Sequence, residues 1–157
     1  MTTLIPLDAQ AIHSLDLSPA RQVIETWLQE GAIASHEQNL SFQIQIVREP
    51  DDPRELSEIP EVRLWFVRLD AAYPWLPFLL DASELARYTA MLVPHQFSPV
   101  EGIQYNPEAL EIFVMHKVFT LAQWLPQQGI SSRTRLKFFT QKLGYELDDA
   151  FFDLLQL

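Results

Sequence analysis

Cysteine is absent from the 157-residue sequence, and glycine is scarce. Without cysteine the chain has no disulfide bond, no thiolate metal site, no iron–sulfur cluster held by cysteine and no thiol nucleophile. Of the four glycines, Gly31, Gly129 and Gly144 stand where helices are expected to end. The sequence contains no GxGxxG or GxxxxGK[ST] phosphate-binding motif and no GxSxG nucleophile elbow, which excludes the standard forms of the corresponding enzymes.

Basic residues are also few: 11 lysines and arginines stand against 21 acidic residues, a net charge of −10. This charge repels phosphate groups, so the composition disfavours nucleic-acid partners and anionic membrane surfaces. The N-terminus shows no signal or transit pattern, and no apolar run reaches the roughly 18 residues that a membrane-spanning helix needs. We therefore expect a cytoplasmic protein with no nucleic-acid partner and no membrane insertion.

The apolar content is sufficient for a folded core, because 48% of the residues are hydrophobic. A chain of this size buries roughly 68–70% of the surface that it exposes when unfolded. No repeat, low-complexity tract or Gly/Ser linker divides the sequence. We therefore predict a single domain over residues 1–157.

Strand patterns are confined to the N-terminal half, where residues 3–7 are expected to form a short strand. Residues 40–46 alternate between apolar and polar side chains, which predicts a strand with one solvent-facing side. Residues 62–69 are apolar on both faces, which predicts a central strand covered on both sides. The acidic loop between these two segments suggests that they form an antiparallel pair.

Helix start and stop signals mark the other elements. We expect helices at Asp8–Leu15, from Ser18-Pro19 to Gly31, from Asp81 or Ser83 to Leu92, from Asn106-Pro107 to Leu125, from Ser131 or Ser132 to Gly144, and a last short one from Asp148. Because strands come first and helices follow, we predict an α+β fold, with a small antiparallel sheet from the N-terminal half packed against C-terminal helices.

The longest predicted helix has two faces of interest. Helical spacing gives it a buried face, formed by Leu110, Val114, Met115, Val118, Leu121, Ala122 and Leu125. A second stripe consists of Phe113, Lys117, Thr120 and Trp124. Phe113, Lys117 and Trp124 are candidate partner contacts, because aromatic side chains are frequent binding anchors. The alternative is that the helix is central and buried on this side too.

The four histidines, His13, His36, His95 and His116, lack the spacing that places two imidazoles on one helix face. Ordinary surface or core histidines are therefore favoured. An uncharacterised metal-dependent enzyme or hydrolase remains the alternative function, and it needs His95, His116 and nearby acids to converge. We expect no cofactor and no enzymatic activity.

The loop at residues 51–61 carries five acidic side chains and one base. Asp51, Asp52 and Glu55 are candidate contacts for a basic partner. The alternative is a solvated loop in which Pro53 begins one helical turn. Near the C-terminus, a basic segment with Arg133 and Lys137 precedes an acidic tail, and we expect these opposite charges to pair internally.

The segment Tyr73–Leu80 is rich in aromatic residues and proline and has no charge. Tyr73, Trp75 and Phe78 are candidate partner contacts if the segment is exposed. The alternative is a connector that crosses the core, since large apolar side chains are usually buried.

Two long stretches carry a family resemblance: ELSEIPEVRLWFVRLDAAYPWLPFLLD and ELARYTAMLVPHQFSPVEGIQYNPEALEIFVMHKVF. They resemble the chlororespiratory reduction six family of cyanobacteria and chloroplasts. The similarity extends to LSPARQVIETWL near the N-terminus and to GYELDDAFFD in the tail, so it covers nearly the whole chain.

The resemblance implies a soluble assembly factor and not an enzyme, in a cyanobacterial member of the family. It implies that the chain assists biogenesis of the photosynthetic NAD(P)H dehydrogenase-like complex. The partner implied is the complex's ferredoxin-like iron–sulfur subunit, and the factor does not stay in the finished complex. The resemblance carries no catalytic residues to this chain.

Overall fold

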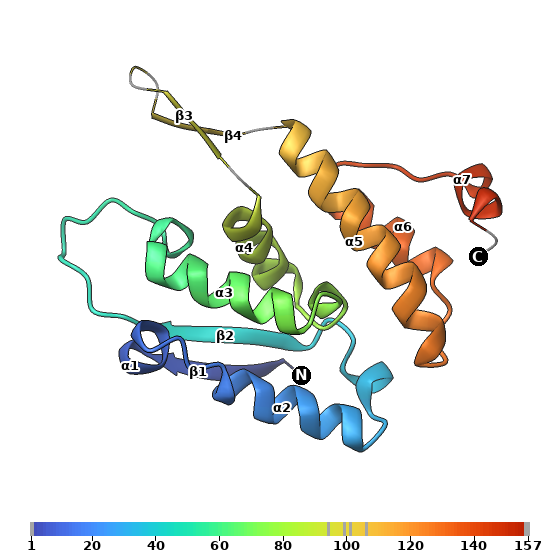
Figure 1. Ribbon diagram of the computed structural model, residues 1–157, viewed down its shortest axis with the longest axis horizontal. Coiled ribbons are helices and arrows are strands. Elements are labelled where there is room, and N and C mark those ends of the chain that lie inside the picture. Colours follow the sequence, from blue (N-terminus) through green and yellow to red (C-terminus); the bar gives the residue numbers. More distant parts are fainter. Residues whose placement is uncertain (1, 94, 99, 101, 106, 156–157) are drawn as a thin grey trace. The chain divides into compact units, whose positions relative to one another are not determined.

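The computed structural model describes residues 2–93, 95–98, 100, 102–105 and 107–155. The chain divides into two compact units, residues 1–93 and residues 94–157. Each unit has its own secondary structure and is considered by itself (Figure 1). The single domain expected over residues 1–157 stays a prediction.

The first unit combines two strands with helices and short 3₁₀ turns. Its elements are β1 (Thr3–Asp8), α1 (Ala9–His13), α2 (Ser18–Gln29), η1 (Ile33–His36), β2 (Leu40–Gln45), η2 (Leu56–Glu58), α3 (Pro60–Ala72), η3 (Leu76–Phe78) and α4 (Ala82–Leu92). The second unit contains β3 (His95–Ser98), β4 (Gly102–Tyr105), α5 (Pro107–Gln127), α6 (Arg133–Lys142) and α7 (Asp149–Leu154).

The N-terminal sheet consists of β1 and β2, which run parallel, with Thr3 opposite Leu40 and Asp8 opposite Gln45. The predicted antiparallel pairing of residues 40–46 with residues 62–69 is therefore wrong, since β2 pairs in parallel with β1 and residues 62–69 lie in a helix. A parallel pair needs a crossover connection, and α1 and α2 lie between the two strands in the chain. The α+β prediction is confirmed, because this small sheet packs against helices; β1 meets α1 and α2, and β2 meets α4.

Residues 62–69, predicted as a strand, form most of α3. Pro60 stands in the first turn, where its fixed φ favours helix and its missing N–H costs nothing. Val62, Trp65, Phe66 and Leu69 are completely buried, at the i, i+3, i+4, i+7 spacing of one helix face. The strand pattern arose because the exposed face of the helix also carries apolar residues.

The helix caps were predicted more successfully. Asp8 accepts a hydrogen bond from the Ala11 amide at 2.8 Å, and Asp81 accepts one from the Glu84 amide at 2.8 Å. Asp148 accepts one from the Phe151 amide at 2.9 Å. These three N-caps are confirmed.

Ser18 is an exception among the predicted helix starts. It lies inside α2, whose N-cap, Leu17, makes no side-chain cap. Asp16 takes over the role near this end, since its carboxylate accepts a hydrogen bond from the Ser18 amide at 3.0 Å.

The core of the first unit forms where β2 meets α3. The Phe42 ring lies edge-on to Trp65 and Phe66, with ring centroids 5.6 and 5.3 Å apart. The Trp65 indole N–H donates to the carbonyl of Asp16 at 2.8 Å, so its polar atom is satisfied inside the core. The Tyr88 hydroxyl donates to Asp70 and ties α4 to α3.

The second unit contains an antiparallel pair, β3 and β4, with His95 opposite Tyr105. This hairpin was not predicted; it lies between the helix expected to end at Leu92 and the helix expected to begin at Asn106-Pro107. The long helix α5 continues two residues past its predicted end at Leu125. Its predicted start at Asn106 lies outside the described residues.

The basic and acidic segments near the C-terminus pair as predicted. Arg133 contacts Asp149 and Asp153 at 3.5 and 3.0 Å, and Lys137 contacts Asp149 at 2.7 Å. These ion pairs join α6 to α7. In the part of the chain that the structure describes, no helix is long and apolar enough to cross a membrane.

Candidate functional site

The apolar segment Tyr73–Leu80 connects α3 to α4. Tyr73 and Phe78 are buried, with 5% and 6% of their surface exposed, and Trp75 is half-buried. The Tyr73 hydroxyl donates to Glu25 Oε1 at 2.7 Å. Burial, and then this carboxylate, raise the pKa of Tyr73 to about 12. Of the three predicted contacts in this segment, Trp75 keeps the most accessible surface.

Main-chain hydrogen bonds hold this segment against the start of β2. The Gln38 amide donates to the Phe78 carbonyl at 3.1 Å, and the Leu40 amide donates to the Leu79 carbonyl at 2.8 Å. Because its main-chain groups are hydrogen-bonded at the start of β2, this segment is part of the folded core, which agrees with the interpretation of Tyr73–Leu80 as a connector.

The predicted stripe on α5 is mostly buried. Lys117 and Trp124 expose 1% and 9% of their surface, and Phe113 is half-buried. The Lys117 ammonium lies 5.8 Å from the centroid of the Phe113 ring, a cation–π distance. Phe113 and Thr120 are therefore the members of the stripe that keep accessible surface, since Thr120 is also half-buried.

Several acidic side chains of the loop at residues 51–61 already form contacts within the loop. Asp52 forms an ion pair with Arg54 at 2.9 Å, and the Arg54 hydrogen bond lowers the pKa of Asp52 to about 2. Glu55 and Glu58 form a reciprocal capping box around η2. The expected helical turn thus begins at Leu56, after Pro53. Asp51 is exposed at the tip of the loop.

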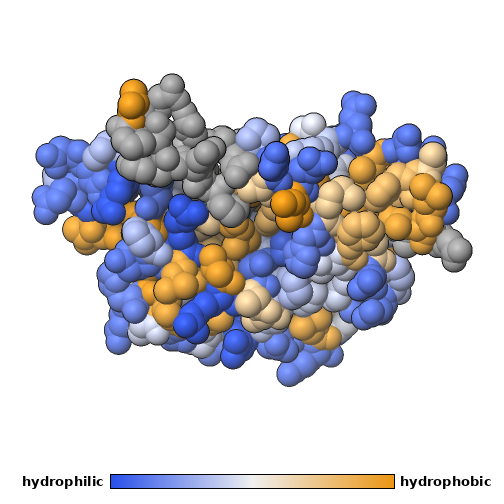
Figure 2. Space-filling model, turned by 45° about the horizontal axis from the view of Figure 1, so that its top comes forward, coloured by the Kyte–Doolittle hydropathy of each residue, from blue (hydrophilic) through white to orange (hydrophobic). Residues whose placement is uncertain are grey.

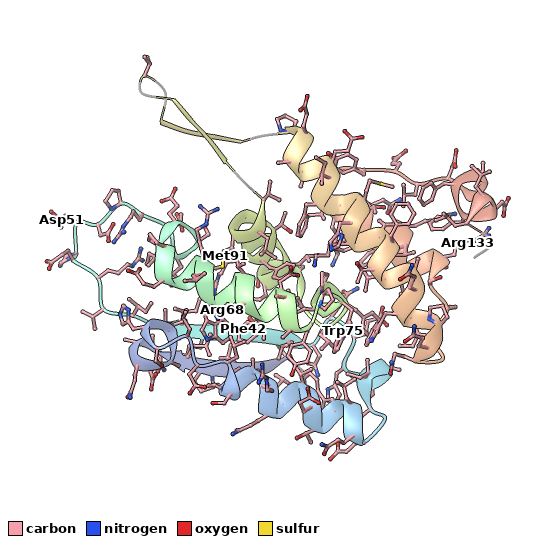
Figure 3. The ribbon with its side chains drawn as sticks, viewed as in Figure 1. Phe42, Asp51, Arg68, Trp75, Met91 and Arg133 are labelled. Atoms are coloured by element: carbon pink, nitrogen blue, oxygen red, sulfur yellow. The ribbon has the colours of Figure 1, made fainter. Side chains whose placement is uncertain are left out.

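The predicted contacts of the first unit do not form one site. Figure 3 shows Asp51 in the loop before α3, whereas Trp75 lies just beyond the opposite end of this helix. Phe113, Lys117 and Trp124 belong to the other unit.

The structure reveals a set of exposed apolar side chains that sequence reasoning missed. Ile112 on α5 exposes 71% of its surface, Phe119 on α5 exposes 44%, and Leu154 on α7 exposes 84%. Figure 2 shows in orange that apolar residues reach the surface in several places. The signal was present in the sequence, because Ile112 and Phe119 stand outside the predicted buried face of α5.

One buried carboxyl group also escaped notice. Glu84 on α4 exposes 1% of its surface, and neither of its carboxylate oxygens accepts a hydrogen bond from the residues that the structure describes. The guanidinium of Arg87 lies 3.4 Å from its Oε2. Burial raises the pKa of Glu84 to about 7, although the charge of Arg87 opposes this. A pKa near 7 is common in catalytic acids. Glu84, however, is enclosed by the side chains packed around it, so a substrate has no access to its carboxyl group.

The described part of the structure does not bring together the two histidines, His95 and His116, that the alternative enzyme function needs. His116 is exposed on α5, and the side chain of His95 lies outside the described part of the chain. Among the described side chains, no three His, Cys, Asp or Glu residues are grouped so that they could hold a metal ion.

Comparison with known proteins places the chain in a family. A family model described as chlororespiratory reduction 6 matches residues 7–154, which is nearly the whole chain. This assembly-factor family is associated with assembly of the NAD(P)H dehydrogenase-like complex. No solved structure matches the chain significantly. The chain belongs to the chlororespiratory reduction 6 family.

Proposed function

We propose that the chain is a cytoplasmic, protein-binding assembly factor of a cyanobacterial NAD(P)H dehydrogenase-like complex. Its partner in this proposal is the ferredoxin-like iron–sulfur subunit, which it holds during biogenesis and then releases. The observation that carries the proposal is the family match over residues 7–154. A chain without cysteine suits a helper that holds the subunit and does not itself ligate the cluster through thiolates.

The surface of the chain supports binding of a protein. Large apolar side chains exposed together are typical of interaction sites, because an isolated soluble domain rarely leaves them in water. Here Ile112, Phe119 and Leu154 are exposed on the second unit, while Asp51 and Trp75 of the first unit also keep accessible surface.

Deletion of the gene in a cyanobacterium tests the assignment. We expect lower amounts of the dehydrogenase-like complex and of its ferredoxin-like subunit, with both restored by a plasmid-borne copy of the wild-type gene. Normal amounts of both in the deletion strain would contradict the proposal.

Metal analysis provides the test against the alternative class. The chain is purified without chelator, and its transition-metal content is measured. A stoichiometric metal, lost when His95 and His116 are replaced, would favour a metal-dependent enzyme over an assembly factor.

A further inference from the structure

The second unit carries a continuous apolar surface that we name the α5–α7 patch: Ile112, Met115, Phe119, Phe151 and Leu154. Ile112, Phe119 and Leu154 are exposed, with 71%, 44% and 84% of their surface accessible, while Met115 and Phe151 are half-buried. Water therefore reaches every member, and two helices contribute to one surface.

The geometry of α5 aligns three of these side chains. Ile112, Met115 and Phe119 stand at i, i+3 and i+7, so they follow one face of the helix. The Phe119 ring lies 6.4 Å from the Phe151 ring of α7, centroid to centroid. Leu154 follows Phe151 by one turn of α7 and extends the surface. The strip along α5 from Ile112 to Phe119 is about 10 Å long.

The patch is not the face by which these helices are packed. Val114, Val118 and Leu121 form a different face of α5 and are buried, and Phe152 of α7 is completely buried. The cations of Arg133 and Lys137 lie over the Phe152 ring, 5.5 and 5.8 Å from its centroid. Both helices thus have another apolar side that is buried, and the patch is additional to it.

The exposed acids on the α5 side of the patch differ from those on α7, which are paired with bases of α6. Glu108 and Glu111 are exposed in the first turns of α5, whereas the acids of α7, Asp149 and Asp153, form ion pairs with α6. The only lysine or arginine in α5 is Lys117, and it is 1% exposed; His116 is exposed on the same helix. On the described surface, α5 therefore presents acids beside the patch and no exposed lysine or arginine.

These observations indicate what the patch binds. Apolar anchors spaced by helical turns match the apolar face of another helix, which is recognised through its i, i+3, i+4 and i+7 positions. Acids beside the anchors favour a helix with lysine or arginine next to its apolar face. A second copy of this chain fits poorly, because its net charge of −10 and the same acids would be brought together.

We propose that the α5–α7 patch docks an amphipathic helix of a partner protein, with lysine or arginine side chains flanking the apolar face of that helix. The inference rests on the proposed function only in taking the partner to be a protein. Its test uses purified chain and a synthetic peptide, whereas the assembly role is tested by gene deletion, so the two can fail separately.

The probe is a fluorescein-labelled helical peptide with leucines at i, i+3, i+4 and i+7 and lysines beside them. A second peptide has glutamate in place of every lysine. Fluorescence anisotropy measures the Kd of each peptide for the full-length chain and for the double variant Ile112→Ser/Phe119→Ser. The matched control is Val47→Ser/Leu64→Ser, which removes apolar side chains that are 97% and 45% exposed on the first unit.

We expect the wild-type chain and the control variant to bind the lysine peptide with the same Kd. The Ile112→Ser/Phe119→Ser protein should bind it at least tenfold more weakly, and the glutamate peptide should bind the wild-type chain at least tenfold more weakly. Equal Kd values for the wild-type and Ile112→Ser/Phe119→Ser proteins would overturn the proposal, as would equal binding of the two peptides.

Two further measurements distinguish other occupants of the patch. We expect the Tm of the Ile112→Ser/Phe119→Ser protein to match that of the control, since exposed side chains stabilise little; a clearly lower Tm would show that the chain itself covers the patch. Sedimentation should show a monomer. A wild-type dimer that these two substitutions dissociate would make a second copy the occupant. Either result would refute the proposal.

Discussion

Among the described residues, the exposed large apolar side chains of residues 1–93 are all aliphatic, whereas those of residues 94–157 include the aromatic rings of Phe119 and Phe138. Trp65 and Phe66 have no exposed surface, while Phe119 exposes 44% and Ile112 exposes 71%. Burial of apolar surface is the main favourable contribution to folding, so the exposed residues of the second unit contribute little to it. Both units therefore have a buried core, and the proposed docking surface lies on the unit whose exposed apolar residues include aromatic rings.

The largest difference between the units is expected when one aromatic side chain is removed from each. Trp65→Ala should lower the free energy of unfolding by about 3–5 kcal/mol, because it leaves a cavity and removes the indole hydrogen bond to Asp16. Phe119→Ala should cost less than about 1 kcal/mol, as expected for a surface site. Urea unfolding measures both values. Similar losses in the two variants would break the comparison.

The next largest effect concerns the buried carboxyl group of Glu84. Burial raises its pKa from the usual value of 4.5 to about 7 in the folded chain, so between these two pH values the folded state retains a proton that the unfolded state releases. Stability is therefore expected to fall as the pH rises from about 4.5 to about 7 and to remain lower above that. Glu84→Gln should remove this loss and be more stable than wild type at pH 8 by up to about 3 kcal/mol.

Urea unfolding of the Glu84→Gln protein at several pH values between about 4 and 8 checks this expectation. Glu30→Gln, at an exposed position in the same unit, is the control for loss of one negative charge. A constant difference in stability between wild type and Glu84→Gln across this range would show that Glu84 does not hold a proton in the folded chain.

A smaller effect, similar in the two units, is expected at the helix caps. Asp81 and Asp148 each accept a hydrogen bond from the amide three residues ahead, at 2.8 and 2.9 Å. Replacing either with alanine should cost about 1 kcal/mol, while asparagine should restore most of the loss, because its carbonyl oxygen can accept the same bond. Thermal unfolding compares the four variants. If asparagine does not restore stability, the aspartate stabilises the helix through its negative charge and not through the capping hydrogen bond.

The smallest effect is expected at the ion pairs between α6 and α7. Asp149 and Asp153 are about two-thirds exposed, at 68% and 70%, and solvent weakens such pairs. Lys137→Met should lower stability by at most about 1 kcal/mol, and the loss should shrink in high salt. Unfolding at low and high salt measures it. A large loss that is insensitive to salt would mean that Lys137 acts through packing on Phe152.

Local signals in the sequence predicted the elements whose formation depends on nearby residues. Asp8, Asp81 and Asp148 marked helix starts because a cap involves only the next turn of the chain. Positive φ angles at Gly31, Gly129 and Gly144 fit the predicted helix ends. The charge pairing of α6 with α7 was also visible, since opposite runs lie next to each other in the sequence.

The predictions that were wrong concern elements whose structure depends on packing between residues far apart in the sequence. Leu64 and Val67 expose 45% and 42% of their surface, so α3 is apolar on its outer side and imitates a buried strand. The parallel pairing of β1 with β2 depends on a crossover that single-strand patterns do not encode.

The candidate site was harder to predict because exposure is a tertiary property. Tyr73, Trp75 and Phe78 have similar apolar character in the sequence, yet only Trp75 is more than slightly exposed. Ile112 and Phe119 could have been identified from their helical spacing outside the predicted buried face. The exposure of Leu154 depends on how α7 packs.

Affinity purification of the tagged chain from cyanobacterial cells, with identification of the bound proteins, tests the central claim most directly. The account predicts that the ferredoxin-like iron–sulfur subunit co-purifies with the wild-type chain, that the mature complex does not, and that Ile112→Ser/Phe119→Ser reduces the recovery of the subunit. Recovery of no subunit of the dehydrogenase-like complex, or of the complete mature complex, would contradict the assignment as a transient assembly factor.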